Sequence, residues 1–157
     1  MSIMSTDGVA DGEAPELNLQ SYLPYRMAVL SEVVAQGLAR QHLDRFNLAI
    51  PEWRVLATLG AFSPLTAKAI GQHSRMHKTK VSRAVTALEA RGLVRGEVSP
   101  HDRREINLWL SDDGQELYRQ IVPLAHAYQA EIVAGIDPQD LETMTRTMEI
   151  IFQRADA

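Results

Sequence analysis

Apolar side chains recur every three or four residues along most of this 157-residue chain, which is the period of amphipathic helices. The first such stretch covers residues 22–45 and stops at the segment NLAIP. Pro51 suits the first turn of a second helix, PEWRVLATLGAF. The residues of this second helix that we expect to face inward are Trp53, Leu56, Ala57 and Leu59–Ala61.

Two further helical segments follow, separated by a short turn. The segment SPLTAKAIGQHS predicts a short helix, and MHKTKVSRAVTALEARG predicts a turn that leads into a longer helix. Gly92 is a natural C-terminal stop for the longer helix, since glycine readily adopts the left-handed conformation. The apolar residues expected on its buried face are Val81, Ala84, Val85 and Leu88.

The period then changes from that of a helix to that of a strand. Ile106, Leu108 and Leu110 alternate with Asn107 and Trp109, as in a half-buried strand. The segment LVRGEV supplies the partner strand, so residues 93–110 predict a β-hairpin with the tip SPHDRR.

Two long helices complete the chain. Ser111 is a candidate N-cap for the first, and Asp137 with Pro138 suits the start of the second. The apolar stripes of the first and last helices are long, and a lone chain has little left to cover them, so we expect self-association.

The order of these elements predicts the fold class. We expect a mainly α-helical protein with one small β-hairpin, in which a helix-turn-helix stands beside a hairpin wing. The expected regions are a disordered acidic tail at 1–17, an N-terminal dimerisation helix at 18–48, a winged helix-turn-helix DNA-binding domain at 49–111 and C-terminal dimerisation helices at 112–157.

Charge is distributed unevenly along the chain. The net charge is −4, but four of the negative residues lie in the N-terminal tail. Between Lys68 and Arg104 there are nine lysines and arginines and only three acidic residues, a local charge of +6. Such a basic segment is the electrostatic footprint of nucleic-acid binding.

The second helix of the expected helix-turn-helix carries its cations and hydroxyls near its N-terminus, the end that reads base edges in a major groove. At the hairpin tip, we expect Arg104 to enter the narrow, negative minor groove, Arg103 to contact phosphate, and Asp102 to fix the turn or pair with an arginine. The candidate DNA-binding residues are His77, Lys78, Thr79, Lys80, Ser82, Arg83, Asp102, Arg103 and Arg104.

Several classes of protein and site are disfavoured. The chain has no cysteine, which excludes disulfides, cysteine zinc sites and thiol sensors. Residues 1–16 lack the cationic start and apolar run of a signal peptide, and no apolar run is long enough to cross a membrane, so we expect a cytoplasmic protein. With no catalytic Ser/His/Asp order, phosphate loop or HExxH motif, we expect no enzyme and no cofactor.

The run LEARGLV at 88–94, followed by Asp-x-Arg at 102–104 and by LSDDG at 110–114, resembles the MarR family of winged helix-turn-helix regulators over residues 20–155. The family more often has Leu-Thr-x-x-Gly where this chain has LSDDG. The resemblance implies a homodimer joined by the terminal helices and bound to double-stranded DNA at a pseudo-palindromic operator. It also implies repression that a small organic effector relieves, and it places Arg104 in the minor groove.

The resemblance further implies an effector pocket lined by the first, second and fifth helices. Aromatic walls with an arginine or histidine suit an aromatic acid or its thioester, and LPYRMAVLSEVV and IPEWRVL look like a branch linked to aromatic-acid catabolism. The candidate ligand-binding residues are Tyr25, Arg26, Leu30, Trp53, Arg54, Tyr118, His126 and Tyr128. Two alternatives stay open: a metal-responsive regulator using residues such as His42 and His126, and a winged-helix protein-binding module without DNA function.

Overall fold

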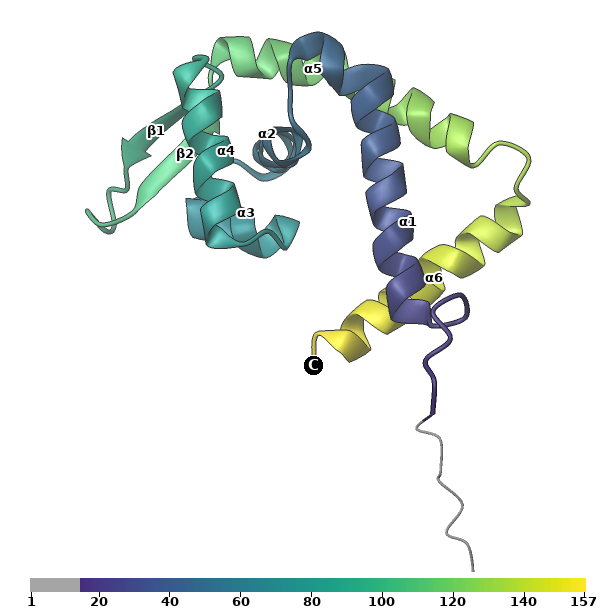
Figure 1. Cartoon of the computed structure of the whole chain (residues 1–157). Coiled ribbons are helices and arrows are strands. Elements are labelled where there is room, and N and C mark those ends of the chain that lie inside the picture. The colour runs from purple at the N-terminus through teal and green to yellow at the C-terminus, as the bar shows by residue number, and fades with distance from the viewer. Residues whose placement is uncertain (1–14) are drawn as a thin grey trace, which may run out of the picture. The chain divides into compact units, whose positions relative to one another are not determined.

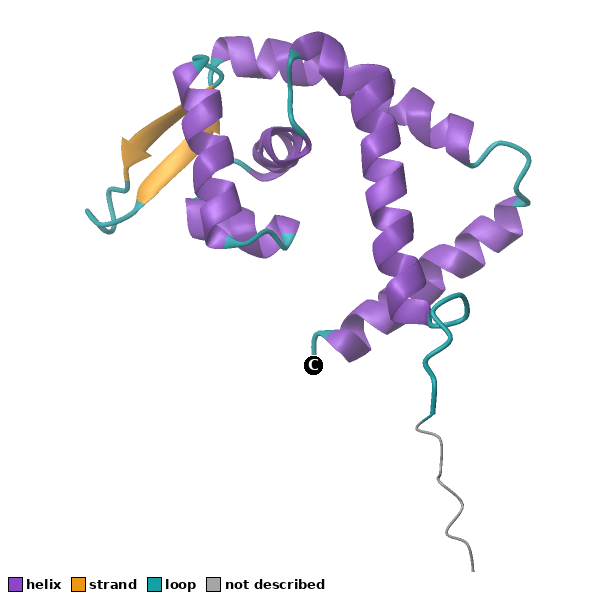
Figure 2. Cartoon of the chain, viewed as in Figure 1, coloured by secondary structure: helices purple, strands orange, loops and turns teal. Residues whose placement is uncertain are grey.

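The computed structural model of the protein describes residues 15–157, so most of the expected acidic tail at 1–17 lies outside the described residues. Six α-helices and one hairpin make up the described chain (Figures 1 and 2). Their bounds are α1 Leu23–Leu38, α2 Ile50–Phe62, α3 Ala67–Ser74, α4 Lys78–Ala90, β1 Val94–Val98, β2 Ile106–Leu110, α5 Asp112–Ile132 and α6 Pro138–Ala155. The chain divides into two units between Ala35 and Gln36.

The helical stretch predicted over residues 22–45 is continuous, but its hydrogen bonding changes along the way. The α-helical pattern of α1 gives way to a π-helical turn at Ala39–Leu43 and a 3₁₀ turn at Asp44–Phe46. Asn47 ends the run in the left-handed conformation, with φ of 51°. Asparagine tolerates this conformation better than most residues, which explains why the helix stops there.

The helix-turn-helix consists of α3 and α4, and both pack against α2. Side chains predicted to be buried on α4 are buried, among them Val81 and Leu88. They meet Val55, Leu56 and Leu59 of α2 and Ile70 of α3 in one core. This core positions α4 so that its polar face is left to solvent.

The hairpin wing is antiparallel, with Val94 opposite Leu110 and Val98 opposite Ile106. Its base is tied to the start of α3, because Leu65 and Leu108 exchange backbone hydrogen bonds of 3.2 and 2.9 Å. The predicted alternation holds for Leu108 and Leu110, which are buried. It fails at Ile106, which is 54% exposed and pairs with the similarly exposed Val98 at the far end of the hairpin.

The caps predicted for the two C-terminal helices are confirmed. The Ser111 hydroxyl accepts a hydrogen bond from the amide of Gly114, and the Asp137 carboxylate accepts one from the amide of Gln139. No residue of α6 is buried in the single chain, and its Met144, Met148 and Phe152 are among the exposed large apolar side chains. Among the described residues, no helix is long and apolar enough to cross a membrane.

One residue of α2 departs from the sequence prediction. Ala61, expected inside, is exposed. It lies in the last turn of α2, where its neighbour Phe62 stacks on His73 of α3. Leu59, two residues earlier, is fully buried as predicted.

Candidate nucleic-acid interface

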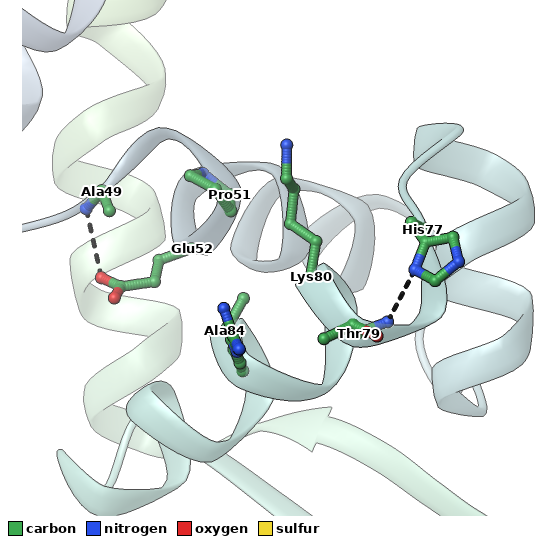
Figure 3. Close-up of a pocket in the computed structure, with 8 residues that line it drawn as sticks. Ala49, Pro51, Glu52, His77, Thr79, Lys80 and Ala84 are labelled. Atoms are coloured by element: carbon green, nitrogen blue, oxygen red, sulfur yellow. Dashed lines mark hydrogen bonds between the residues drawn. The ribbon is translucent and has the colours of Figure 1, made fainter.

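The N-terminal end of α4 presents a row of exposed polar side chains. His77 is the N-cap: its Nδ1 atom accepts a hydrogen bond of 3.2 Å from the backbone amide of Thr79. This bond is drawn in Figure 3. His77 therefore fixes the start of the helix in addition to being a candidate contact. The other candidates on α4, all exposed, are Lys78, Thr79, Lys80, Ser82 and Arg83.

A surface hollow of about 470 Å³ lies between this end of α4 and the start of α2. Lys80 lies on one side, and Pro51 and Glu52 lie on the other (Figure 3). Arg83 also lines the hollow. Glu52 is already engaged, since its carboxylate accepts a hydrogen bond of 3.1 Å from the amide of Ala49. The hollow thus brings the cations Lys80 and Arg83 of α4 together with the first turn of α2.

Two neighbouring hollows extend the same surface toward the wing. One of about 740 Å³ shares His77 with the first and adds Lys78, Ser82 and Lys68. Another of about 400 Å³ shares Ser82 and Lys68 and is also lined by Arg104. These shared residues make the surface continuous from the start of α2, across α4, to the wing. We call it the basic face.

The wing tip is closed by main-chain and Asp102 hydrogen bonds. The amide of Ser99 donates to the carbonyl of Glu105 at 2.8 Å, and the amide of Glu105 donates to the carbonyl of Asp102 at 3.0 Å. The Asp102 carboxylate accepts a bond of 2.9 Å from the amide of Arg104. Asp102 therefore holds the turn through the backbone, the first of the two roles that the sequence left open.

The cations between residues 68 and 104 fall into two groups. Three are engaged within the protein. Arg75 pairs with Asp156 at 2.8 Å, Arg95 pairs with Glu97 at 2.7 Å, and Arg91 donates to backbone carbonyls. The other six side chains have no hydrogen bond or ion pair within residues 15–157: Lys68, Lys78, Lys80, Arg83, Arg103 and Arg104. All six are exposed. Unpaired cations on one surface are available to a polyanion.

The structure adds two residues that the sequence reasoning missed. Lys68 and Thr86 line the same hollow as Ser82 and Arg104. Thr86 lies four residues after Ser82 and seven after Thr79, so helical periodicity alone could have found it. Lys68 lies in the first turn of α3, and only the packing of α3 beside α4 brings it to the basic face.

The ligand candidates are distributed differently. Trp53 and Tyr118 stack, with ring centroids 6.5 Å apart and an interplanar angle of 25°. Tyr128 is buried, and its ring makes a T-shaped contact with that of His42, with centroids 6.2 Å apart. Arg54 and His126 are exposed. The remaining candidates, Tyr25, Arg26 and Leu30, are exposed on α1. None of these eight residues lines the three hollows of the basic face.

The metal alternative receives no support from side-chain geometry. Across residues 15–157, no three His, Asp or Glu side chains are grouped as metal ligands. The Nδ1 atom of His42 instead lies 3.0 Å from an Nη atom of Arg45. Arginine can only donate, so this nitrogen is occupied as an acceptor.

Helix-turn-helix, buried core and hairpin wing define the class: the fold is that of a winged helix-turn-helix protein. The family model described as "MarR family" matches residues 46–105. A MarR-family transcriptional regulator of known crystal structure from Silicibacter pomeroyi is 27% identical, with a TM-score of 0.75 over 89% of this chain and 96% of that chain. The chain is therefore similar to MarR-family transcriptional regulators, in sequence over residues 46–105 and in fold over most of its length.

Other proteins show the same similarity. The uncharacterised HTH-type regulator YwoH of Bacillus subtilis is 25% identical over 74% of this chain and 84% of its own. The HTH-type transcriptional repressor IacR of Pseudomonas putida is 20% identical over 93% of this chain and 87% of its own. The DNA complex of Staphylococcus aureus MepR shares the fold, with 21% identity and a TM-score of 0.76 over 85% of this chain and 98% of that one.

Proposed function

We propose that this protein is a homodimeric, sequence-specific DNA-binding repressor that a small organic ligand releases from its operator. The observation that carries the proposal is the basic face, on which the unpaired cations of α3, α4 and the wing lie along one continuous surface. The MepR–DNA complex, a protein of the same fold, supports DNA as the partner, and the name of IacR supports repression.

The proposal gives each candidate DNA contact a role. Lys78, Lys80 and Arg83 of α4, with Thr79 and Ser82 between them, meet base edges and phosphates of a major groove. Arg104 enters the minor groove, Arg103 contacts phosphate, and Asp102 holds the turn. His77 caps the helix and Lys68 adds a phosphate contact. Residues 49–111 form the DNA-binding domain, and residues 18–48 and 112–157 form the dimer.

The exposed apolar side chains of α1 and α6 support the dimer. Leu30 and Val33 on α1 and Met148 on α6 leave apolar surface to solvent in the single chain. Burial of such surface in a second copy would yield about 25 cal/mol per Å². Two copies would present two basic faces to one duplex, as a pseudo-palindromic operator requires.

The stacked pair of Trp53 and Tyr118 supports an aromatic ligand. Flat apolar walls suit an aromatic ring, and the exposed guanidinium of Arg54, next to Trp53 in sequence, would bind a carboxylate. The ligand class we propose is an aromatic carboxylic acid or its thioester.

A titration against DNA tests the proposal. Fluorescence anisotropy with a labelled fragment from upstream of the protein's own gene should give saturable binding whose logarithmic affinity falls linearly with the logarithm of salt concentration. A fragment of equal length and shuffled sequence is the control and should bind more weakly. Failure to retain any fragment of genomic DNA would reject the proposal and would favour a protein-binding module.

A further inference from the structure

Arg91 is an exposed basic residue of the 68–104 segment whose guanidinium is engaged by other groups of the protein. It follows the last residue of α4, and its guanidinium makes two hydrogen bonds, from Nη1 to the carbonyl of Asn47 and from Nη2 to the carbonyl of Phe46, each 2.8 Å long. The two carbonyls belong to neighbouring residues, which precede Arg91 by 44 and 45 positions in the chain. One planar fork therefore grips two neighbouring peptide groups.

These carbonyls are at the end of the helical run that begins with α1. The amide of Asn47 bonds to the carbonyl of Asp44, and the amide of Leu48 bonds to the carbonyl of Leu43. With Asn47 in the left-handed conformation, this is a Schellman motif. The motif leaves the carbonyls of Phe46 and Asn47 without a helical partner, and the positive guanidinium of Arg91 satisfies both at the negative end of the helix dipole.

The surroundings of Arg91 argue against a phosphate contact there. In the hollow of about 480 Å³ that Arg91 lines, the carboxylates of Asp44 and Glu52 outnumber the single cation, so the lining is net negative and disfavours a phosphate. Leu48, which also lines this hollow, is buried in the common core together with Leu43 and with Leu88 of α4. The Arg91 guanidinium thus joins the C-terminal end of α4 to the end of the helical run, next to buried core leucines.

We propose that Arg91 is a positioning residue for DNA binding. It fixes the orientation of α4 relative to residues 39–47, the segment through which the N-terminal helix enters the DNA-binding domain. In a dimer, the contact of Arg91 with residues 46 and 47 holds the two copies of α4 at a fixed separation and angle. Both copies then fit successive major grooves, and binding costs little conformational entropy. The inference rests on the proposed function, because it concerns how two DNA-binding domains act together.

Comparison of a full operator with a half operator tests this role. The DNA is a site selected by the wild-type protein from a random-sequence pool, and a second duplex has one half-site scrambled. Arg91→Ala should weaken binding to the full site about tenfold while half-site binding changes less than about twofold, because only the coupling between domains is lost. Arg91→Lys keeps the charge but not the fork and should lie between wild type and Arg91→Ala.

Two control variants separate the alternatives. Arg83→Ala removes a proposed direct contact and should weaken full-site and half-site binding alike. Arg119→Ala removes an exposed arginine of α5 that pairs with Glu116 and should change neither. If Arg91→Ala weakens both sites alike and lowers the salt slope, Arg91 contacts DNA and the proposal is wrong. Unchanged affinity for the full site would also overturn it, whatever the melting temperature does.

The contact of the Arg91 guanidinium with the carbonyls of Phe46 and Asn47, which we call the clamp, can also be tested without DNA. This test holds even if the proposed function fails. The chain has no cysteine, so Gln41→Cys with Thr86→Cys places spin labels on the helical run and on α4 and nowhere else. In labelled chains diluted with unlabelled protein, Arg91→Ala should broaden the distance distribution relative to Arg91. Equal widths would overturn the clamp. Absence of DNA binding by the wild type, with a broadened distribution in Arg91→Ala, would reject only the proposed function.

Discussion

The ring of Tyr118 lies directly over Gly60: a Cβ atom added to Gly60 would come within 2.5 Å of Cε2 and 2.6 Å of Cζ of Tyr118. Tyr118 cannot move aside freely, because its ring also stacks on the indole of Trp53. Gly60 is therefore the reason that α5 can pack its tyrosine against α2.

Gly60→Ala should lower the free energy of unfolding by about 1–3 kcal/mol, because the clash outweighs the gain in helix propensity. Chemical denaturation measures the change. In a Tyr118→Ala background, the same substitution should be neutral or stabilising, since the space is then open. Additive effects of the two substitutions would show that the contact is not the cause.

Arg104→Ala should weaken binding to the operator by about 1–3 kcal/mol and reduce the salt slope by about one. The physical reason is the loss of a cation that the wing holds out to the duplex. Anisotropy titrations at four salt concentrations give both quantities. Arg119→Ala, on α5, is the matched control, and an unchanged affinity in Arg104→Ala would contradict the proposed role of the wing.

Substitutions of Asp102 separate geometry from charge. Asp102→Ala should weaken operator binding by about 1 kcal/mol, because the amide of Arg104 loses its acceptor. Asp102→Asn keeps an acceptor oxygen and removes a negative charge near phosphates, so it should bind at least as tightly as the wild type. If alanine and asparagine behave alike, the hydrogen bond does not position Arg104.

Trp53 can report directly on the proposed ligand. In a Trp109→Phe background it is the remaining tryptophan of the chain, and benzoate or benzoyl thioester should change its emission saturably. Cyclohexanecarboxylate has the same charge without an aromatic ring and should bind more weakly. If no aromatic acid changes the emission or releases the DNA, the proposed ligand class is wrong.

Met148→Glu should convert the dimer to a monomer, because it places a charge in the apolar stripe of α6. Met148 is 52% exposed in the single chain, so the substitution leaves the fold of the monomer little changed. Light scattering after size exclusion measures the mass. Thr143→Glu adds the same charge to α6 at an exposed polar position and should leave the dimer intact; dissociation of both variants would point to general charge effects.

The helices, the hairpin and their caps could be predicted from sequence because each depends on local chemistry. Ser111, Asp137 and Gly92 mark ends that neighbouring backbone groups determine, and the buried positions of α4 follow from its period. Exposure at Ile106 could not be predicted in the same way. An alternating pattern states which face a residue takes, but not how far along the strand the rest of the protein reaches.

The basic face was predicted in outline, but its membership depended on tertiary contacts. Arg75, Arg91 and Arg95 raise the local charge as much as Lys80 does, and each has a partner distant in sequence or across the hairpin. Arg95 lies over the ring of Trp109, with Cζ 5.2 Å from the centroid. A charge count cannot distinguish an arginine that packs on an aromatic ring from one left to solvent.

The exchange of backbone hydrogen bonds between Leu65 and Leu108 divides the wing into a constrained root and an independent tip. Side-chain changes at the root disturb the start of α3 and hence the whole helix-turn-helix. Among the described residues, the main chain of residues 99–105 forms hydrogen bonds only within the hairpin, and Ser99 is buried, so the sequence or length of residues 100–105 can be altered without refolding the domain. The protein's minor-groove preference should therefore be open to engineering by loop exchange alone.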